Sequence, residues 1–159
     1  MSLRSGEPRA QMLLSSLVAL ILSALPLPPP LDSLRPPFLV IVVLYWSIAT
    51  PRAGGLTLGF AAGLALDAFQ GSVLGQHALA LSLVTYIAVR EHQKIRSKPY
   101  FQQALVVLGL LFVYEFMTFS IDGWSGHPMT SPRRWLHIAT GAAIWPFIAA
   151  LLERTHHRR

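Results

Sequence analysis

Long apolar stretches separate the few charged residues of this chain, and this pattern restricts the folds open to it more than any other feature. A helix needs about 20 mainly apolar residues to cross a lipid bilayer. Only 13% of the 159 residues are charged, whereas soluble domains carry about 25%. We therefore expect an all-α integral membrane protein with a single transmembrane domain over residues 1–159 and no separate soluble module.

Prolines, glycines and charged residues divide the apolar sequence into about six predicted transmembrane helices. We place them at 11–27, 36–50, 54–69, 74–89, 100–121 and 135–152. The stretch over 54–89 is too long for one span, so we predict a turn at 70–72; one long kinked helix or a re-entrant pair are the alternatives. The helix at 36–50 is short, which indicates either a locally thin bilayer or a helix packed inside the bundle.

The distribution of lysine and arginine predicts the orientation of the bundle. If the N-terminus is cytoplasmic and six helices follow, ten of the 13 basic residues lie on the cytoplasmic side. The other three, Arg35, Arg133 and Arg134, lie outside. This bias matches the positive-inside rule, so we expect both termini in the cytoplasm.

A stripe of small residues stands out within 54–69. Gly55, Gly59, Gly63 and Asp67 recur at steps of four, which place them along one face of a helix. Glycines on such a face allow another helix to approach closely. The stripe is therefore expected either to pack within this bundle or to contact a helix of a partner protein.

Asp67 is a carboxylate within an apolar segment, where it needs a partner or a proton. Three interpretations stay open. It caps the following turn by accepting hydrogen bonds from backbone amides near Ser72, or from Gln76 or His77; it binds a polar group of a partner; or it titrates during transport. If it acts only as an acceptor, Asp67→Asn should retain function.

Other polar residues form a second group of candidates. Glu115 is an acid within the helix predicted at 100–121, and an interhelical hydrogen bond is its simplest explanation; Gln76 and His77 are further candidates for buried polar contacts. A cytoplasmic basic cluster is predicted to contact anionic lipids; it consists of Arg90, Lys94, Arg96 and Lys98.

Several function classes find no support in the sequence. No nucleophile stands beside a base, no glycine-rich loop follows a strand, and no zinc-binding His pair is present, so we predict no enzyme, no metal and no cofactor. The net charge of +6 arises from basic residues at the ends of apolar runs. That placement is typical of membrane anchoring, so nucleic acid is not expected as a partner.

Four segments together resemble the MreD family of rod shape-determining proteins. They are RPPFLV at 35–40, LYW at 44–46, GFAAGLALD at 59–67 and GSVLGQHAL at 71–79. The last two follow the family pattern G-x-x-x-G-L-x-x-D and then G-x-x-L-G-x-x-A-L. Through this motif the resemblance marks Gly59, Gly63, Asp67, Gly71 and Gly75 as functional positions.

The resemblance implies a non-enzymatic component of bacterial cell-wall elongation in the inner membrane. Its expected partner is MreC and, through MreC, RodA, a class B penicillin-binding protein and MreB. It also implies a fold similar to the six-helix substrate-binding component of energy-coupling-factor transporters. The alternative function is therefore a small-molecule-binding or transporter-like subunit with a cavity between its helices.

Overall fold

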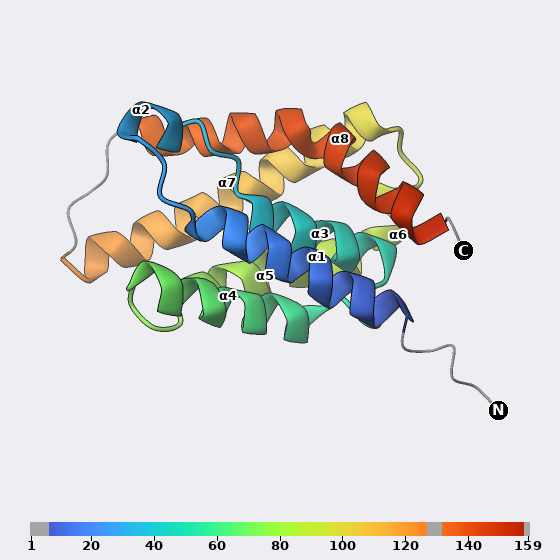
Figure 1. Ribbon diagram of the computed structural model, residues 1–159, viewed down its shortest axis with the longest axis horizontal. Helices are drawn as coiled ribbons and strands as arrows, with labels where there is room; N and C mark the ends of the chain where they lie inside the picture. Colours follow the sequence, from blue (N-terminus) through green and yellow to red (C-terminus); the bar gives the residue numbers. More distant parts are fainter. Residues whose placement is uncertain (1–6, 127–131, 158–159) are drawn as a thin grey trace.

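The computed structural model describes residues 7–126 and 132–157, and within these ranges all regular structure is helical (Figure 1). The elements are α1 (Glu7–Ala24), α2 (Pro29–Asp32), α3 (Phe38–Ala49), α4 (Leu56–Gln70), α5 (Gln76–Arg90), α6 (His92–Arg96), α7 (Tyr100–Trp124), the 3-10 helix η1 (Pro132–Trp135) and α8 (Leu136–His157). Each of the six predicted ranges overlaps one of the longer helices. The predicted turn after residue 69 separates α4 from α5.

Two of these helices, over Tyr100–Trp124 and Leu136–Thr155, are long and apolar enough to cross a membrane. The helices α3, α4 and α5 have 12, 15 and 15 residues. At 1.5 Å per residue these helices are roughly 18–22 Å long, which is shorter than the hydrocarbon core of about 30 Å. The all-helical fold with two candidate spans is consistent with a helical membrane protein, and six crossings remain a prediction.

The short helices α2 and α6 were not predicted. Prolines end α1, as expected, but a proline is also tolerated in the first turn of a helix, and α2 begins at Pro29. The basic segment after α5 forms α6, whose Ile95 is buried and contributes to the core. Several limits also differ from the prediction: α1 covers Glu7–Ala24 rather than 11–27, α7 continues to Trp124 rather than 121, and α8 continues to His157 rather than 152.

The helix α3 is the centre of the bundle. All its residues from Leu39 to Ile48 are buried, and it contacts α1, α4, α5, α6 and α8. The short helix predicted at 36–50 is therefore packed inside the bundle, which was one of its two interpretations. Trp46 and Trp145 are both buried in the core, where their ring nitrogens lie near Ser15 Oγ (2.8 Å) and Gln103 Oε1 (3.3 Å).

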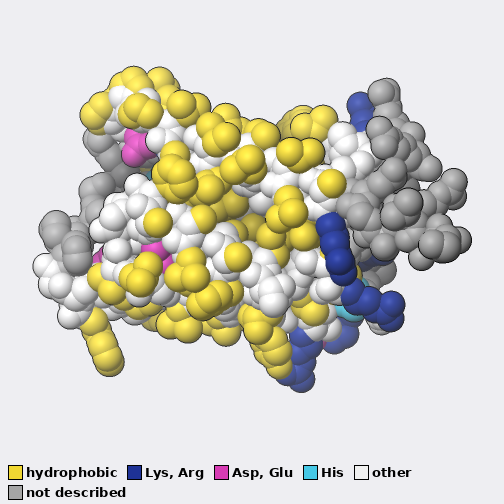
Figure 2. All heavy atoms as spheres, turned by 60° about the horizontal axis from the view of Figure 1, so that its bottom comes forward, with side chains coloured by type: hydrophobic (Ala, Val, Ile, Leu, Met, Phe, Trp, Pro, Cys, Tyr) yellow, Lys and Arg dark blue, Asp and Glu magenta, His cyan; other side chains and the backbone are white. Residues whose placement is uncertain are grey.

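Apolar side chains also cover the outside of the bundle. Figure 2 shows them over most of one face, with lysines and arginines gathered at one end. Large exposed hydrophobic residues project from α1, α4, α7 and α8; examples are Leu14, Phe60, Phe101 and Phe147. We call the end that holds α6 the basic end, and the end that holds the α4–α5 turn and η1 the turn end.

Two glycines of the predicted stripe, Gly59 and Gly63, lie in the contact between helices of this same chain, and Gly55 lies against the turn that precedes α4. A Cβ atom at Gly63 would lie 2.5 Å from the Ala78 nitrogen and 2.6 Å from the His77 oxygen, both in the α5 backbone. A Cβ at Gly59 would meet the Thr85 side chain of α5 at 2.5 Å, and one at Gly55 would meet the Pro51 oxygen at 2.8 Å. The stripe therefore allows α4 and α5 to pack at short range, as the first of its two interpretations predicted.

Replacing Gly63 with alanine should destabilise the protein, since the α5 backbone cannot move aside as a flexible side chain could. We expect a cost of about 1–3 kcal/mol, typical of overpacking, measured as a lower melting temperature in detergent. Gly109→Ala is the matched control, because Gly109 is also helical and a Cβ there meets no atom within 4 Å. Equal melting temperatures for the two variants would contradict close packing at Gly63.

Candidate functional site

The turn between α4 and α5 depends on two glycines with left-handed backbone conformations. Gly71 ends α4 with φ +62°, and Gly75 precedes α5 with φ +98°. Side chains other than hydrogen are disfavoured at such angles. A Cβ at either position would meet no atom within 4 Å. Within this chain, both glycines therefore shape the turn, and a role for them in partner binding or helix packing stays a prediction.

Asp67 lies beneath this turn, and its residue is only 1% exposed. Its Oδ1 accepts hydrogen bonds from Ser72 Oγ (2.8 Å) and from the His77 backbone nitrogen (2.9 Å), and it lies 2.8 Å from His77 Nδ1. Its Oδ2 accepts from the backbone nitrogens of Gly75 (2.9 Å) and Ala78 (3.4 Å). Both carboxylate oxygens are thus occupied by donors from the turn and the first turn of α5.

This arrangement makes Asp67 a capping residue supplied by the preceding helix. The first amides of an α-helix have no partner within the helix, and the positive end of the helix dipole also favours an anion there. The residue before α5 is Gly75, which has no side chain that could cap it. Asp67 satisfies these amides instead, and the contacts are those that the capping interpretation predicted.

Ser72, His77 and Asp67 form a cluster that the sequence analysis did not identify. In a hydrolytic triad, the serine and the carboxylate contact different nitrogens of the histidine. Here Ser72 Oγ and Asp67 Oδ1 both lie near Nδ1, at 3.2 Å and 2.8 Å. The cluster therefore stabilises the turn and lacks the geometry of a charge-relay nucleophile.

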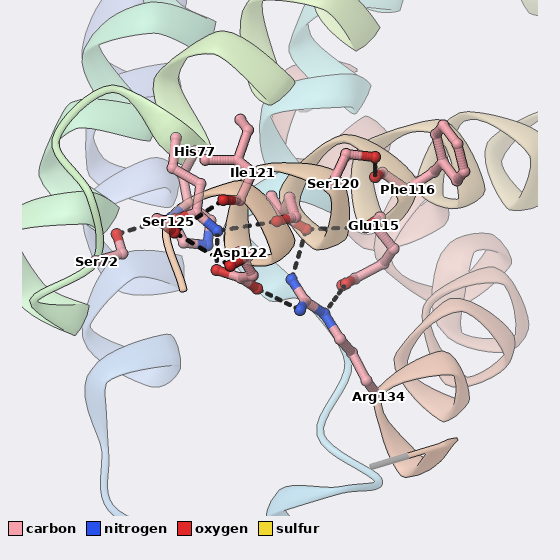
Figure 3. A network of polar contacts seen from close by, with 11 residues as sticks. Ser72, His77, Glu115, Phe116, Ser120, Ile121, Asp122, Ser125 and Arg134 are labelled. Atoms are coloured by element: carbon pink, nitrogen blue, oxygen red, sulfur yellow. Dashed lines mark hydrogen bonds and ion pairs between the residues drawn. The ribbon is translucent and has the colours of Figure 1, made fainter. Parts of the chain in front are cut away.

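A second polar network surrounds Arg134 of η1 (Figure 3). Its guanidinium donates to Glu115 Oε2 (2.9 Å), Asp122 Oδ2 (2.5 Å) and Thr118 Oγ1 (2.7 Å), all on α7. The side chains of Arg134, Glu115 and Asp122 are only 16%, 10% and 19% exposed. The network joins the last turns of α7 to the segment that precedes α8.

Of this network, only Glu115 was predicted from the sequence as a buried polar contact; Arg134 was placed outside the membrane and Asp122 was not singled out. The sequence nevertheless contains a pattern that predicts this network. Glu115, Thr118 and Asp122 follow one another at steps of three and four, so they share a face of α7. Two acids on one face of an apolar helix need a cation, and Arg134 lies shortly after them in the chain.

Gln76 and His77 connect the two networks at the turn end. Gln76 Nε2 donates to Asp122 Oδ1 (2.6 Å) and to the Thr118 backbone oxygen (3.2 Å). The His77 ring lies 6.1 Å from the Tyr114 ring of α7. Both side chains line a cleft of about 810 Å³, together with Arg35, Glu115, Asp122 and Arg134. A polar cleft is thus present at the turn end of an otherwise apolar bundle.

The predicted basic cluster lies at the opposite end, with all four side chains exposed; it comprises Arg90, Lys94, Arg96 and Lys98 of α5, α6 and the residues after them. The Lys94 ammonium lies 2.6 Å from the Glu91 carboxylate, and this contact lowers the pKa of Glu91.

Over 7–126 and 132–157, no three His, Asp or Glu side chains converge on a position that could hold a metal ion.

Comparison with known proteins gives the family. The family model of the rod shape-determining protein MreD matches residues 9–155. This chain belongs to the MreD family. A curated relative, the rod shape-determining protein MreD of Haemophilus influenzae, is 31% identical over 144 residues, which cover 89% of this chain and 87% of that protein. No solved structure matches, so the likeness to energy-coupling-factor transporters stays a prediction.

Membership of the MreD family gives this membrane protein a role in rod shape determination. Within it, the motif that carried the resemblance has a clear physical basis at three positions. Gly63 allows α5 to approach, Asp67 caps α5, and Gly75 permits the turn between them. The motif therefore describes how two helices are joined and held together.

The capping geometry revises the expectation for Asp67→Asn. Because both oxygens of Asp67 accept backbone amides, an asparagine would direct its own NH₂ group at one of those donors. We expect a loss of about 1–3 kcal/mol of stability, and a larger loss for Asp67→Ala, both measured by thermal unfolding in detergent. Asp32→Asn is the control, since that side chain is 58% exposed; a similar effect at both sites would contradict the capping role.

Proposed function

We propose that this protein is a non-enzymatic membrane component of bacterial cell-wall elongation that binds MreC. Through MreC it would support the assembly of RodA, a class B penicillin-binding protein and MreB. Membership of the MreD family over residues 9–155 carries the proposal. The polar contacts add support: Asp67, Glu115 and Arg134 hold helices to one another, which suits a scaffold.

The same proposal includes six membrane spans with both termini in the cytoplasm. The basic side chains of α5 and α6 lie at the end where α8 finishes, and the ionised network of α7 and η1 lies at the other. Hydrophobic side chains surround the bundle between these ends. A bilayer that is thinner around the short helices would accommodate them.

The structure restricts where MreC would bind. The glycine stripe faces α5 of the same chain, so it is not free to receive a partner's helix. The contact would instead use the outward apolar side chains, which in α1 include Leu14, Leu17 and Ile21, each more than half exposed. Close van der Waals packing would then supply the affinity within the membrane.

The basic cluster is proposed to bind anionic lipids of the cytoplasmic leaflet. Each exposed lysine or arginine near such a surface contributes about 1 kcal/mol of attraction. The side chain of Lys94 is 78% exposed at the basic end. This contact would fix the depth and orientation of the bundle.

Capture of MreC tests the proposed function. Affinity-tagged protein, isolated in mild detergent from cells that also express MreC of the same genome, should retain MreC. The Gly109→Ala variant should retain as much MreC as the wild-type protein does, because that position has space for a methyl group. Failure to recover MreC, even after cross-linking in cells, would contradict the proposal.

Single cysteines test the topology, since the chain has none of its own. Ser125→Cys at the turn end should react with a membrane-impermeant maleimide added to intact spheroplasts. Ser97→Cys at the basic end should react only after the membrane is permeabilised. Both residues are exposed, so access to the reagent depends on the side of the membrane. Labelling of both from outside would refute the six-span arrangement.

A further inference from the structure

The cleft at the turn end has the size and lining of a binding site. Its volume of about 810 Å³ lies within the range of about 300–1,000 Å³ that is usual for small-molecule sites. Seven helices and η1 contribute to its wall, with apolar residues such as Leu27 and Val73 beside the charged ones. It therefore combines an apolar surface with a few convergent polar groups.

The charged groups of this wall carry an excess of negative charge. Three carboxylates line the cleft, those of Asp32, Glu115 and Asp122, against the two guanidinium groups of Arg35 and Arg134. The two histidines in the wall are His77 and His137, and His137 Nδ1 lies 2.5 Å from the Arg35 backbone oxygen. The three carboxylates and two guanidinium groups together carry a formal charge of −1, which favours a cationic ligand.

Among the residues that the structure describes, two acceptor atoms at this wall have no hydrogen-bond donor. Gln76 is only 4% exposed, and its Oε1 is buried without a hydrogen bond. Its amide cannot simply be reversed, since Nε2 donates to Asp122 Oδ1 and an oxygen there would face a carboxylate. Arg134 uses Glu115 Oε2, and no hydrogen bond or ion pair among the described residues uses Glu115 Oε1.

We propose that this cleft binds a primary ammonium group, with Glu115 Oε1 and Gln76 Oε1 as its acceptors. A primary ammonium has three N–H donors, which can hydrogen-bond to these acceptors, and one positive charge, which balances the excess negative charge of the carboxylates. Because Gln76 Oε1 is buried, the Gln76 side chain must rotate before this oxygen can reach a ligand in the cleft. The group can come from a soluble amine or from the head group of phosphatidylethanolamine.

Native mass spectrometry of the purified full-length protein tests the proposal. The detergent-solubilised protein is titrated with phosphatidylethanolamine and with phosphatidylcholine of the same acyl chains. Phosphatidylcholine carries a positive charge but has no N–H donor. We expect phosphatidylethanolamine to bind about tenfold more tightly, because hydrogen bonds to charged groups are among the stronger ones. Equal affinity of the wild-type protein for the two lipids would overturn the proposal, and this comparison needs no sequence variant.

Soluble ethanolamine distinguishes the two sources of the ammonium group. Displacement of bound phosphatidylethanolamine by ethanolamine at millimolar concentration indicates a site for free amines. Retention of the lipid indicates a site for the head group, held also by its phosphate and chains. Both results support an ammonium site.

Variants locate the site. Glu115→Gln should remove most of the preference for phosphatidylethanolamine, whereas Glu91→Gln should retain it, because Glu91 lies at the basic end. Gln76→Leu should also reduce the preference, since it removes the second acceptor. An unchanged preference in Glu115→Gln and Gln76→Leu, with both proteins eluting as wild type in size exclusion, would overturn the proposed location.

Discussion

The structure depends on one contact more than on any other: the Asp67 carboxylate beneath the first amides of α5. In a membrane, water cannot satisfy the free amides of a helix end, and each unsatisfied group costs several kcal/mol. A cap from within the turn is impossible where Gly75 precedes the helix, because glycine has no side chain. Asp67 of the preceding helix accepts hydrogen bonds from these amides, so that α4 and α5 form one structural unit.

That unit is connected to the rest of the bundle through residues adjacent to the cap. The glycine stripe holds α4 against α5 along their length, while Gln76 contacts α7 at Asp122 and Thr118. Arg134 then joins α7 to the start of α8. The polar groups of the turn end therefore link α4, α5, α7 and α8 without occupying the apolar outer surface, which is left for lipid and for a partner.

The sequence predicted the longer helices, since apolar runs and their breaks are local properties. It gave the cap as one of three interpretations of Asp67, because a lone acid next to a glycine turn has few available partners within the chain. It did not predict the Arg134 network, which joins residues 12 to 19 positions apart across an interhelical segment. Nor did it place Trp46 and Trp145 in the core, because burial depends on which faces of the helices meet.

Amide hydrogen exchange tests the central claim directly. In the wild-type protein, the amides of Gly75, His77 and Ala78 should exchange slowly, because they donate to Asp67. In Asp67→Ala the same amides should exchange at least tenfold faster, while amides around Gly109 in α7 keep their wild-type rates. Equal protection of residues 75–78 in both proteins would show that the Asp67 carboxylate does not hold α5 in place.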